Sequence, residues 1–482
     1  MSIREPAILG LDLGTAEAKA GLVALDGRLL ALARSGYELE RRGGHGWAEQ
    51  DPGAWWSAVV SAVRALRASE IGEIVAIGVD GHGPTLAAVD RRGEATRPAI
   101  TFLDSRASAE AEELTAATGV RGWALGGLPA ALWVERHEPE VAVATCWYLA
   151  TWEWLAFRLT GEAVAPLVPD QLVPDPGWVS ALGVPADRIP RIARTGDVVG
   201  SLTEIAADAL GLRAGTPVIG GTVDAFASYL GAGLLEPGDA YDPGGSAGGF
   251  GVYWDRLLEV PGAFVTPAPI AGRFSVGAAM AATGRALDWY RDQVLVDTVS
   301  IDALLGEAAA TPPGADGLVF LPYLAGERSP IWDPDARGVL AGLTLGHGRA
   351  HISRAIVEAS ALAIRHVAAP MLAAGVRVTE MRVCGGPARS RFWNGVKADV
   401  TGFPVAVPTV LETAVLGSAI LGAVGIGEHR DLRTAIAAIT RIESRIEPRR
   451  ELASVYDRLF EAYQALYPAT APLLRPLQEL SA

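Results

Sequence analysis

One carboxylate followed by a glycine-rich turn marks the segment with the most chemical potential in this sequence. Asp224 comes after Gly220 and Gly221 in an uncharged stretch, and the turn that follows it contains Gly245 and Ser246. A carboxylate can remove a proton from a hydroxyl group, and a glycine-rich turn can hold a polyphosphate on its backbone N–H groups. A turn aspartate and an ordinary tight hairpin are the alternative interpretation of the same residues.

A second candidate turn lies near the N-terminus. Residues 7–14 form an apolar stretch that contains Asp12 and ends at the pair Gly14 and Thr15, with Lys19 a few residues later. A carboxylate can hold Mg²⁺ through water, while amides and a hydroxyl group suit phosphate oxygens. An ordinary turn at the end of a strand, with a surface lysine, would give the same pattern.

Two polar sites follow apolar stretches and could contact a ligand. The strand predicted at 74–79 is followed by the sequence Asp80-Gly81-His82-Gly83-Pro84-Thr85. Ligands of open α/β sheets bind beyond strand ends, so this segment is a candidate substrate wall, although His82 could instead cap a turn. Asp104 is followed by Arg106, and this pair could form a local ion pair or contact sugar hydroxyl groups.

The remaining pattern predicts the elements that position these residues. Asp26-Gly27 separates two short apolar runs and predicts a hairpin. The periodicity predicts helices at about 56–68 and 349–369, and a small-residue helix at 412–425. The second half repeats the order strand, glycine-rich turn, strand at 239–254, which indicates two related α/β domains. A strand at 381–384 leads to Gly385-Gly386 and then to a helix that begins near Arg391, and an amphipathic helix ends the chain.

Length, charge and cysteine content limit the function classes. The chain has 482 residues, a formal net charge of −14 and two cysteines. The length favours two large domains, and the negative charge argues against a nucleic-acid or anionic-membrane surface. The first residues lack the pattern of a signal peptide, and no apolar run is long enough to predict a membrane span. We therefore expect a cytoplasmic protein that binds neither nucleic acid nor membrane.

Four segments in the same order resemble the FGGY family of carbohydrate kinases, which belongs to the actin/hexokinase/Hsp70-type ATPase superfamily. The first resembles the family's opening phosphate turn, the second its catalytic segment, the third its C-terminal signature and the fourth its adenine loop. In that order they are GLDLGTAEAK (10–19), GGTVDAFASYLGAGLLEPGD (220–239), GERSPIWDPDARGVLAGLTLGHGRAHISRAIVEA (326–359) and CGGPARSRFWNGVKADVTGFPV (384–405).

The resemblance implies an α/β fold of two RNase-H-like domains, with ATP and sugar in the cleft between them. It implies that Asp224 is the general base and that Asp12 holds Mg²⁺ through water. It further implies an ATP and phosphate site formed by Gly14, Thr15, Gly245, Ser246, Gly385, Gly386 and Asn394. The sugar would contact His82, Gly83, Pro84, Asp104 and Asp224. Gly245 stands where the family commonly has threonine, so the second turn offers only the Ser246 hydroxyl group.

The expected boundaries are a sugar-binding domain at 1–235, an ATP-binding domain at 236–440 and a helical tail at 441–482 that docks on a domain. The leading hypothesis is an ATP-dependent kinase of a neutral ketose or polyol, best represented by a xylulose-like pentulose. A catalytically weak sugar- or nucleotide-binding regulator of the same fold is the alternative. The substrate, the hydroxyl group that receives the phosphate and the oligomeric state stay open, with a homodimer as one option.

Overall fold

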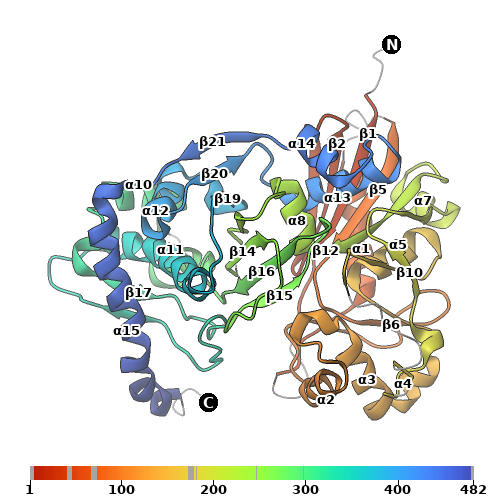
Figure 1. Cartoon of the computed structure of the whole chain (residues 1–482), viewed down its shortest axis with the longest axis horizontal. Helices are drawn as coiled ribbons and strands as arrows, with labels where there is room; N and C mark the ends of the chain where they lie inside the picture. Colours follow the sequence, from red (N-terminus) through yellow and green to blue (C-terminus); the bar gives the residue numbers. More distant parts are fainter. Residues whose placement is uncertain are drawn as a thin grey trace. The chain divides into compact units, whose positions relative to one another are not determined.

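In the computed structural model, the chain forms two compact units (Figure 1). It describes residues 5–40, 46–66, 73–171, 179–180, 182–245, 247–296 and 298–478. Unit 1 comprises Met1–Leu235, Thr266–Gly272 and Glu412–Thr440, and unit 2 comprises Glu236–Val265, Arg273–Leu411 and Arg441–Ala482. Ser246, one of the predicted phosphate-binding residues, lies outside the described residues.

Unit 1 is built on a six-stranded sheet. Its strands have the order β11-β12-β5-β1-β2-β3, with bounds Val198–Ser201, Pro217–Val223, Ile74–Gly81, Ala7–Leu13, Glu17–Ala24 and Leu29–Gly36. β1 pairs antiparallel with β2 and parallel with β5, and β5 pairs parallel with β12. The predicted hairpin at Asp26-Gly27 is confirmed, because β2 and β3 pair antiparallel around it. The carboxyl ends of β1, β5 and β12 therefore meet at one edge of the sheet.

Helices cover both faces of this sheet. On one face, α1 (Pro52–Ala65), α5 (Thr151–Thr160) and α7 (Glu204–Leu210) bury large side chains such as Trp55 and Trp154 against the strands. On the other face, α13 (Thr413–Gly425) lies against β1 and β5, with α8 (Asp224–Ala232) beside it (Figure 1). Eleven of the thirteen residues of α13 are small or β-branched and the other two are leucines, so the helix is slim and can approach the sheet and α8 closely.

The other elements of unit 1 are short. The helices are α2 (Ser108–Thr118), η1 (Gly122–Leu125), α3 (Leu128–His137), α4 (Pro139–Ala144), η2 (Ala186–Arg188) and α14 (Leu432–Ile439). The strands form three two-stranded sheets: β4 (Glu49–Gln50) with β7 (Ala99–Ile100), β6 (Ala87–Val89) with β8 (Trp147–Leu149), and β9 (Val164–Leu167) with β10 (Arg191–Arg194).

Unit 2 is built on a seven-stranded sheet. Its order is β15-β16-β14-β13-β19-β20-β21, with bounds Phe264–Pro267, Phe274–Ala279, Gly249–Trp254, Asp239–Asp242, Glu380–Val383, Val405–Pro408 and Ile442–Ile446. β13 pairs antiparallel with β14 and parallel with β19, which pairs parallel with β20. The central strand of each unit thus has one antiparallel and one parallel neighbour, and in both units a turn and an antiparallel strand follow it, in the order that the sequence repeats.

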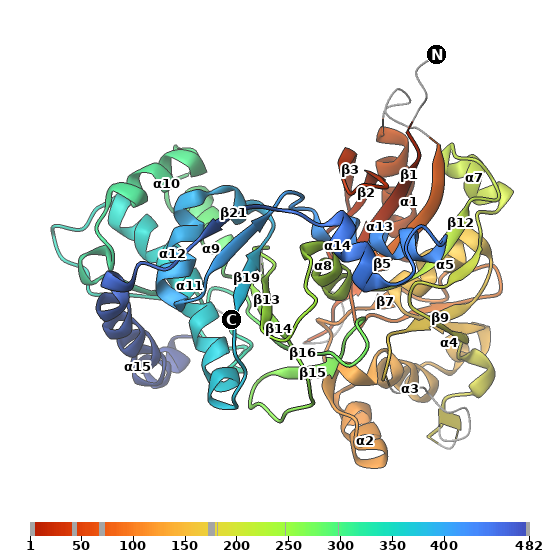
Figure 2. The same cartoon turned by 45° about the horizontal axis from the view of Figure 1, so that its top comes forward.

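The long helix α11 (Arg349–Ala373) packs one end on this sheet and the other on a second apolar cluster with α15 (Ala453–Gln478). α11 and α12 (Arg391–Thr401) both contact α15, and both views show α15 beside them (Figures 1 and 2). The remaining elements are α9 (Arg285–Trp289), η3 (Tyr290–Val294), α10 (Ile301–Ala310), η4 (Ala315–Gly317), β17 (Val319–Leu321), β18 (Val339–Ala341), η5 (Gly386–Arg389) and η6 (Arg450–Leu452). Within the described residues, α11 alone has the length and apolar composition of a membrane span, but most of it is buried inside unit 2.

Three details differ from the predicted boundaries. Residues 266–272, expected in the second domain, belong to unit 1. Residues 412–440, expected in the second domain, pack with unit 1, because α13 covers the sheet face beside β1 and β5. Residues 442–446, expected at the start of a helical tail, form β21 and extend the sheet of unit 2. The final helix is present and buries Tyr456, Leu459 and Tyr463 in unit 2.

Candidate active site

The predicted first phosphate turn, Gly14–Glu17, connects β1 to β2 in unit 1. Asp12 lies one residue before the end of β1 and is 3% exposed. Its Oδ2 atom lies 3.0 Å from Nζ of Lys19, which also lies 3.7 Å from a carboxylate oxygen of Glu412. The negative charge of Asp12 is the main cause of a raised pKa of Lys19, and burial has a smaller, opposite effect. The lysine therefore stays charged. The turn therefore begins at a carboxylate whose direction is set by an ion pair.

Two further acidic residues come to the same edge of the sheet. Asp80 on β5 lies in register with Asp12 on β1 and with Thr222 on β12. Asp224 follows two residues after Thr222 and is the first residue of α8. Asp80 is fully buried, and Oγ of Ser418 donates to its Oδ2 at 2.5 Å. Burial, and next the charge of Asp12, raise the pKa of Asp80 well above its usual range. Asp80 is therefore held neutral at this edge of the sheet.

Asp224 has the properties of a base that works near neutral pH. Burial, and then the negative charge of Asp12, raise its pKa to about 7, against the lowering effects of the Ala225 N–H group and Lys19. The Ala225 N–H group donates to Oδ1 of Asp224 at 2.7 Å. A carboxylate with a pKa near the working pH is both available to accept a proton and basic enough to do so.

His82 lies beside the first phosphate turn. Its backbone N–H group donates to the carbonyl of Leu13 at 2.9 Å, and its carbonyl accepts from Oγ1 of Thr151 at 2.6 Å. Nδ1 lies 3.0 Å from Oγ1 of Thr85, whereas Nε2 is buried and has no hydrogen-bond partner among the described residues. Burial lowers the pKa of His82 to about 3, so its imidazole is neutral and offers one unused nitrogen.

The neighbouring Gly83 and Pro84 shape this wall and offer few hydrogen bonds. A Cβ atom at Gly83 would lie 3.0 Å from the Trp152 ring, so the glycine lets the indole approach the backbone. Nε1 of Trp152 is buried, and the described residues provide no acceptor for it. Pro84 has no N–H group. Trp152 is thus a possible hydrogen-bond donor that the sequence analysis did not identify.

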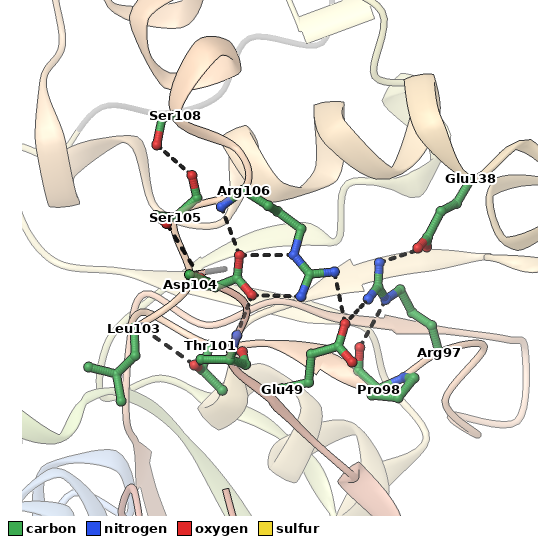
Figure 3. Close-up of polar contacts among 12 residues, drawn as sticks. Glu49, Arg97, Pro98, Thr101, Leu103, Asp104, Ser105, Arg106, Ser108 and Glu138 are labelled. Carbon is green, nitrogen blue, oxygen red and sulfur yellow. Dashed lines mark hydrogen bonds and ion pairs between the residues drawn. The ribbon is translucent and has the colours of Figure 1, made fainter. Parts of the chain in front are cut away.

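Asp104 is engaged by its own surroundings, as Figure 3 shows. Its Oδ1 accepts from the backbone and Nε of Arg106, both at 2.9 Å, and its Oδ2 accepts from Nη2 of Arg106 and the Ala48 N–H group, both at 2.6 Å. The side chain of Asp104 is 0% exposed. These contacts favour the local ion pair over the expected direct contact with a sugar.

The predicted second phosphate turn follows β13 in unit 2 and includes Gly244 and Gly245. Gly244 has φ of 56°, and a Cβ atom there would lie 2.1 Å from the carbonyl oxygen of Cys384, so only glycine fits. The Gly244 N–H group donates to Oδ1 of Asp242 at 2.9 Å. The other carboxylate oxygen of Asp242 pairs with Lys397, and both side chains are almost fully buried. Each phosphate turn thus starts from an aspartate that is paired with a lysine.

The predicted adenosine loop lies next to this second turn. A Cβ atom on Gly385 would lie 2.7 Å from the Pro243 carbonyl, which brings the two loops into backbone contact, and Gly386 begins the short helix η5. Asn394 is 1% exposed, and its Nδ2 donates to the carbonyl of Ala388 at 2.7 Å. In the structure Asn394 therefore holds the loop, and only its buried Oδ1 has no donor among the described residues.

Few protein ligands are available for a divalent metal. Within the described ranges no cluster of three or more histidine, cysteine, aspartate or glutamate side chains has the arrangement of a metal site. Oδ1 of Asp12 is nevertheless buried without a donor from the described residues, and a carboxylate oxygen suits Mg²⁺. Mg²⁺ keeps several waters and commonly uses one or two carboxylates with substrate phosphates, so Asp12 fits a metal that arrives with a nucleotide.

Comparison with known proteins identifies the family. Sequence models of the FGGY family of carbohydrate kinases match residues 7–167 with the N-terminal domain and residues 257–426 with the C-terminal domain. The crystal structure of xylulose kinase from Rhodospirillum rubrum is 31% identical, covers 97% of this chain and 100% of its own, and superposes with a TM-score of 0.79. The xylulose kinase of Staphylococcus epidermidis is 28% identical over 98% of both chains, and the gluconokinase of Bacillus subtilis is 26% identical over 98% of both.

The two sheet-containing units, each with a phosphate-type turn after its central strand, define an α/β protein of the actin-like ATPase fold. The chain belongs to the FGGY family of carbohydrate kinases. It catalyses the ATP-dependent phosphorylation of a sugar, as the leading hypothesis predicted, and nothing in the comparisons favours the weak regulator. The similar proteins act on more than one kind of sugar, so similarity alone does not select the substrate.

Proposed function

We propose that the acceptor is a neutral sugar, a xylulose-like pentulose, and that Asp224 is the general base. The observation that carries the proposal is that Asp224, with a pKa raised to about 7, lies at the same sheet edge as Asp12 and the first phosphate turn. In phosphoryl transfer, the acceptor oxygen forms a bond to the γ-phosphorus as the bond to the ADP oxygen breaks. Asp224 would receive the proton of the acceptor hydroxyl group.

The rest of the chemistry is positioning and charge neutralisation. Asp12 would hold Mg²⁺ through water, and the metal, when bound, would neutralise charge on the phosphates. Backbone N–H groups of Thr15 and of the second phosphate turn would bind phosphate oxygens, and Gly385 and Gly386 would line the adenosine. Lys19 keeps the carboxylate of Asp12 in one direction, because its ammonium group lies 3.0 Å from Oδ2.

The charge of the wall favours a neutral sugar over an aldonate. His82 is neutral because burial lowers its pKa to about 3, and Gly83 and Pro84 carry no charge. Lys19 is already paired with Asp12 and Glu412, and Arg106 is paired with Asp104 and Glu49. Because both cations are already paired, neither is available to bind a substrate carboxylate, which would also lie near the carboxyl groups of Asp12 and Asp224. The xylulose kinases among the similar proteins support the same choice.

An ADP-release assay across pentuloses, hexuloses, polyols and aldonates tests the proposal. We expect the highest kcat/KM for a neutral pentulose such as D-xylulose, little activity with gluconate and a poor reaction with glycerol, which has too few hydroxyl groups. The sugar-free reaction gives the background rate of ATP hydrolysis. A clear preference for gluconate would contradict the assignment of the wall.

A further inference from the structure

A short ribbon of chain holds the first phosphate turn. One side of the ribbon is the segment Tyr37–Glu40, which follows β3, and the other is β4 (Glu49–Gln50). Glu40 and Glu49 exchange two backbone hydrogen bonds, both 2.9 Å long, so the two segments lie side by side. Both contribute donors to the turn.

Every carbonyl group of the turn Gly14–Glu17 accepts a hydrogen bond from the protein. The donors are Oη of Tyr37 to Gly14, Nε2 of Gln50 to Thr15 at 2.7 Å, the N–H of Tyr37 to Ala16 at 3.0 Å, and the N–H of Gly14 to Glu17 at 3.1 Å. By contrast, within the described part of the chain no group accepts from the N–H of Thr15 or Ala16. The carbonyl groups are used by the protein, and two N–H groups are left for a ligand.

Peptide geometry links these two facts. In a planar trans peptide the C=O and N–H groups point in opposite directions. The bond from Gln50 to the Thr15 carbonyl therefore turns the N–H of Ala16 away from the ribbon. In the same way, the bond from Tyr37 to the Gly14 carbonyl turns the N–H of Thr15 away from it. Successive N–H groups that face one side form a site for an anion such as phosphate.

The orientation of the Gln50 side chain is determined by a second contact. Nε1 of Trp55 lies 3.2 Å from Oε1 of Gln50, and both residues are almost fully buried. The indole N–H can only donate, so it must meet the oxygen of the amide. The nitrogen of Gln50 is thereby the end that faces Thr15.

A buried ionic cluster holds the strand that carries Gln50 (Figure 3). Oε1 of Glu49 lies 2.8 Å from Nη1 of Arg106, and Asp104 accepts from the other two guanidinium nitrogens, Nη2 and Nε. The N–H of Ala48 donates to Asp104 at 2.6 Å. The guanidinium carbon of Arg106 lies 3.7 Å from the centre of the Trp47 ring, so the cluster also packs against the residue before Ala48. Three consecutive residues before Gln50 are thus fixed by groups from the 104–106 segment.

We infer that Gln50 is a positioning residue for phosphoryl transfer, because its side-chain amide holds the Thr15 carbonyl and thereby directs the Ala16 N–H group toward the nucleotide phosphates. The cluster of Asp104, Arg106 and Glu49 supports it by holding β4. The inference rests on the proposed role of the first phosphate turn and adds the groups that orient it. Gln50 itself touches neither substrate.

The variant Gln50→Met tests the inference, because it keeps the size of the side chain and removes both hydrogen bonds. Calorimetry with Mg²⁺ and a non-hydrolysable ATP analogue should show binding about 3- to 10-fold weaker, the effect of losing one hydrogen bond. Binding of AMP should be unchanged, since AMP lacks the terminal phosphates. Thr160→Val is the matched control, because it removes a buried hydrogen bond of unit 1, from Thr160 to the Ala156 carbonyl at 2.8 Å. It should change neither affinity.

Tyr37→Phe provides the second variant, which is needed if Gln50→Met does not fold. It removes only the bond to the Gly14 carbonyl, and we expect the same selective loss of ATP-analogue binding. Equal losses for the analogue and for AMP would show a merely structural role and overturn the inference.

Asp12→Ala separates failure of the inference from failure of the proposed function. If Asp12→Ala weakens binding of the Mg²⁺–ATP analogue and Gln50→Met and Tyr37→Phe do not, the positioning role is overturned and the phosphate site stands. If none of the three variants changes the affinity for the analogue, the first turn is not the phosphate site, and the proposed function is overturned together with the inference.

Discussion

Three aspartates at one sheet edge have different surroundings. Asp12 is paired with Lys19, Asp80 is buried and held neutral, and Asp224 has a pKa near 7. Like charges close together cannot all ionise cheaply, so a neutral Asp80 limits the negative charge beside Asp12. Environments that separate the pKa values of neighbouring carboxyl groups commonly separate their roles. We assign the base to Asp224 on this ground.

Replacing the base should slow the chemical step and leave binding intact. Asp224→Asn keeps the shape of the side chain but cannot accept the hydroxyl proton. We expect kcat to fall by roughly 10²–10⁴-fold, the usual contribution of general acid–base catalysis. Binding of the ATP analogue and thermal unfolding should match the unmodified enzyme. Turnover within about threefold of the unmodified enzyme would show that Asp224 is not the base.

The raised pKa of Asp224 also predicts a pH dependence. A general base works only when it is ionised, and burial raises the pKa of Asp224 to about 7. The value of kcat/KM for the sugar should therefore fall as the pH decreases through about 7, and the decrease should be absent in the residual activity of Asp224→Asn. A pH–rate profile at saturating ATP measures this. A profile that stays flat down to about pH 5 would indicate an ordinary carboxyl group.

His82 should affect binding of the sugar more than turnover. Its imidazole is neutral and one buried nitrogen has no partner among the described residues, so it can form one hydrogen bond with a hydroxyl group. His82→Ala should raise the KM for the sugar with a smaller decrease in kcat, as the loss of uniform binding does. His82→Gln, which keeps a polar side chain, should recover part of the affinity. An unaltered KM in His82→Ala would remove it from the sugar wall.

The site residues that sequence alone could predict share one signal, a polar residue at the end of an apolar strand. Asp12 and His82 were predicted in this way, and Asp224 was predicted as the one carboxylate in an uncharged, glycine-rich stretch; the structure places all three at one sheet edge. The sequence could not show that both carboxylate oxygens of Asp104 accept hydrogen bonds from Arg106 and Ala48, because these contacts depend on the packing of the chain. Gln50 and Lys397 were missed for the same reason, since their partners are about 35 and 155 residues away in the chain.

At the scale of elements, periodicity predicted the long helices, but it did not show which sheet the helix α13 covers. The helices at 349–373 and 453–478 follow the predicted apolar patterns, and a helix begins at Arg391 as predicted. The small-residue helix α13 was also predicted, but its sequence does not say which sheet it covers. Its slim surface fits unit 1, where α8 crosses it at close range. Residues 442–446 form a strand whose side chains alternate in burial. In the sequence this alternating pattern is too short to distinguish a strand from a loop.

The contact between α8 and α13 should tolerate no added carbon atom at Gly417. A Cβ atom there would lie 1.8 Å from the carbonyl oxygen of Ala227, so Gly417→Ala must push the helices apart. We expect it to lower the free energy of unfolding by about 1–3 kcal/mol, as overpacking does. Gly395→Ala on α12 is the control, because no atom lies near its Cβ position. It should raise stability by about 0.5–1 kcal/mol. Denaturant unfolding of both variants tests this, and equal effects would contradict the packing argument.

At the scale of the whole molecule, the chain builds the same order of five core strands twice, β3-β2-β1-β5-β12 and β16-β14-β13-β19-β20, and then returns to the first unit. In both units the central strand ends near an aspartate paired with a lysine, Asp12 with Lys19 and Asp242 with Lys397. This agreement supports the duplication that the sequence order suggested. The return of residues 412–440 to unit 1 means that a cut of the chain at residue 235 does not separate two complete folding units.

A fragment of residues 1–235 should therefore not fold on its own. It lacks α13, whose Val415, Leu416, Ile420 and Leu421 are almost fully buried. At about 1.5–3 kcal/mol for each such side chain, their burial contributes roughly 6–12 kcal/mol, which is comparable to the whole stability of a domain. Fusing residues 412–440 to the fragment through a flexible linker should restore cooperative thermal unfolding and native near-ultraviolet circular dichroism. A fusion that carries Gly417→Ala should unfold at a lower temperature. Cooperative unfolding of residues 1–235 alone, at the temperature of the fusion, would show that α13 is dispensable to unit 1.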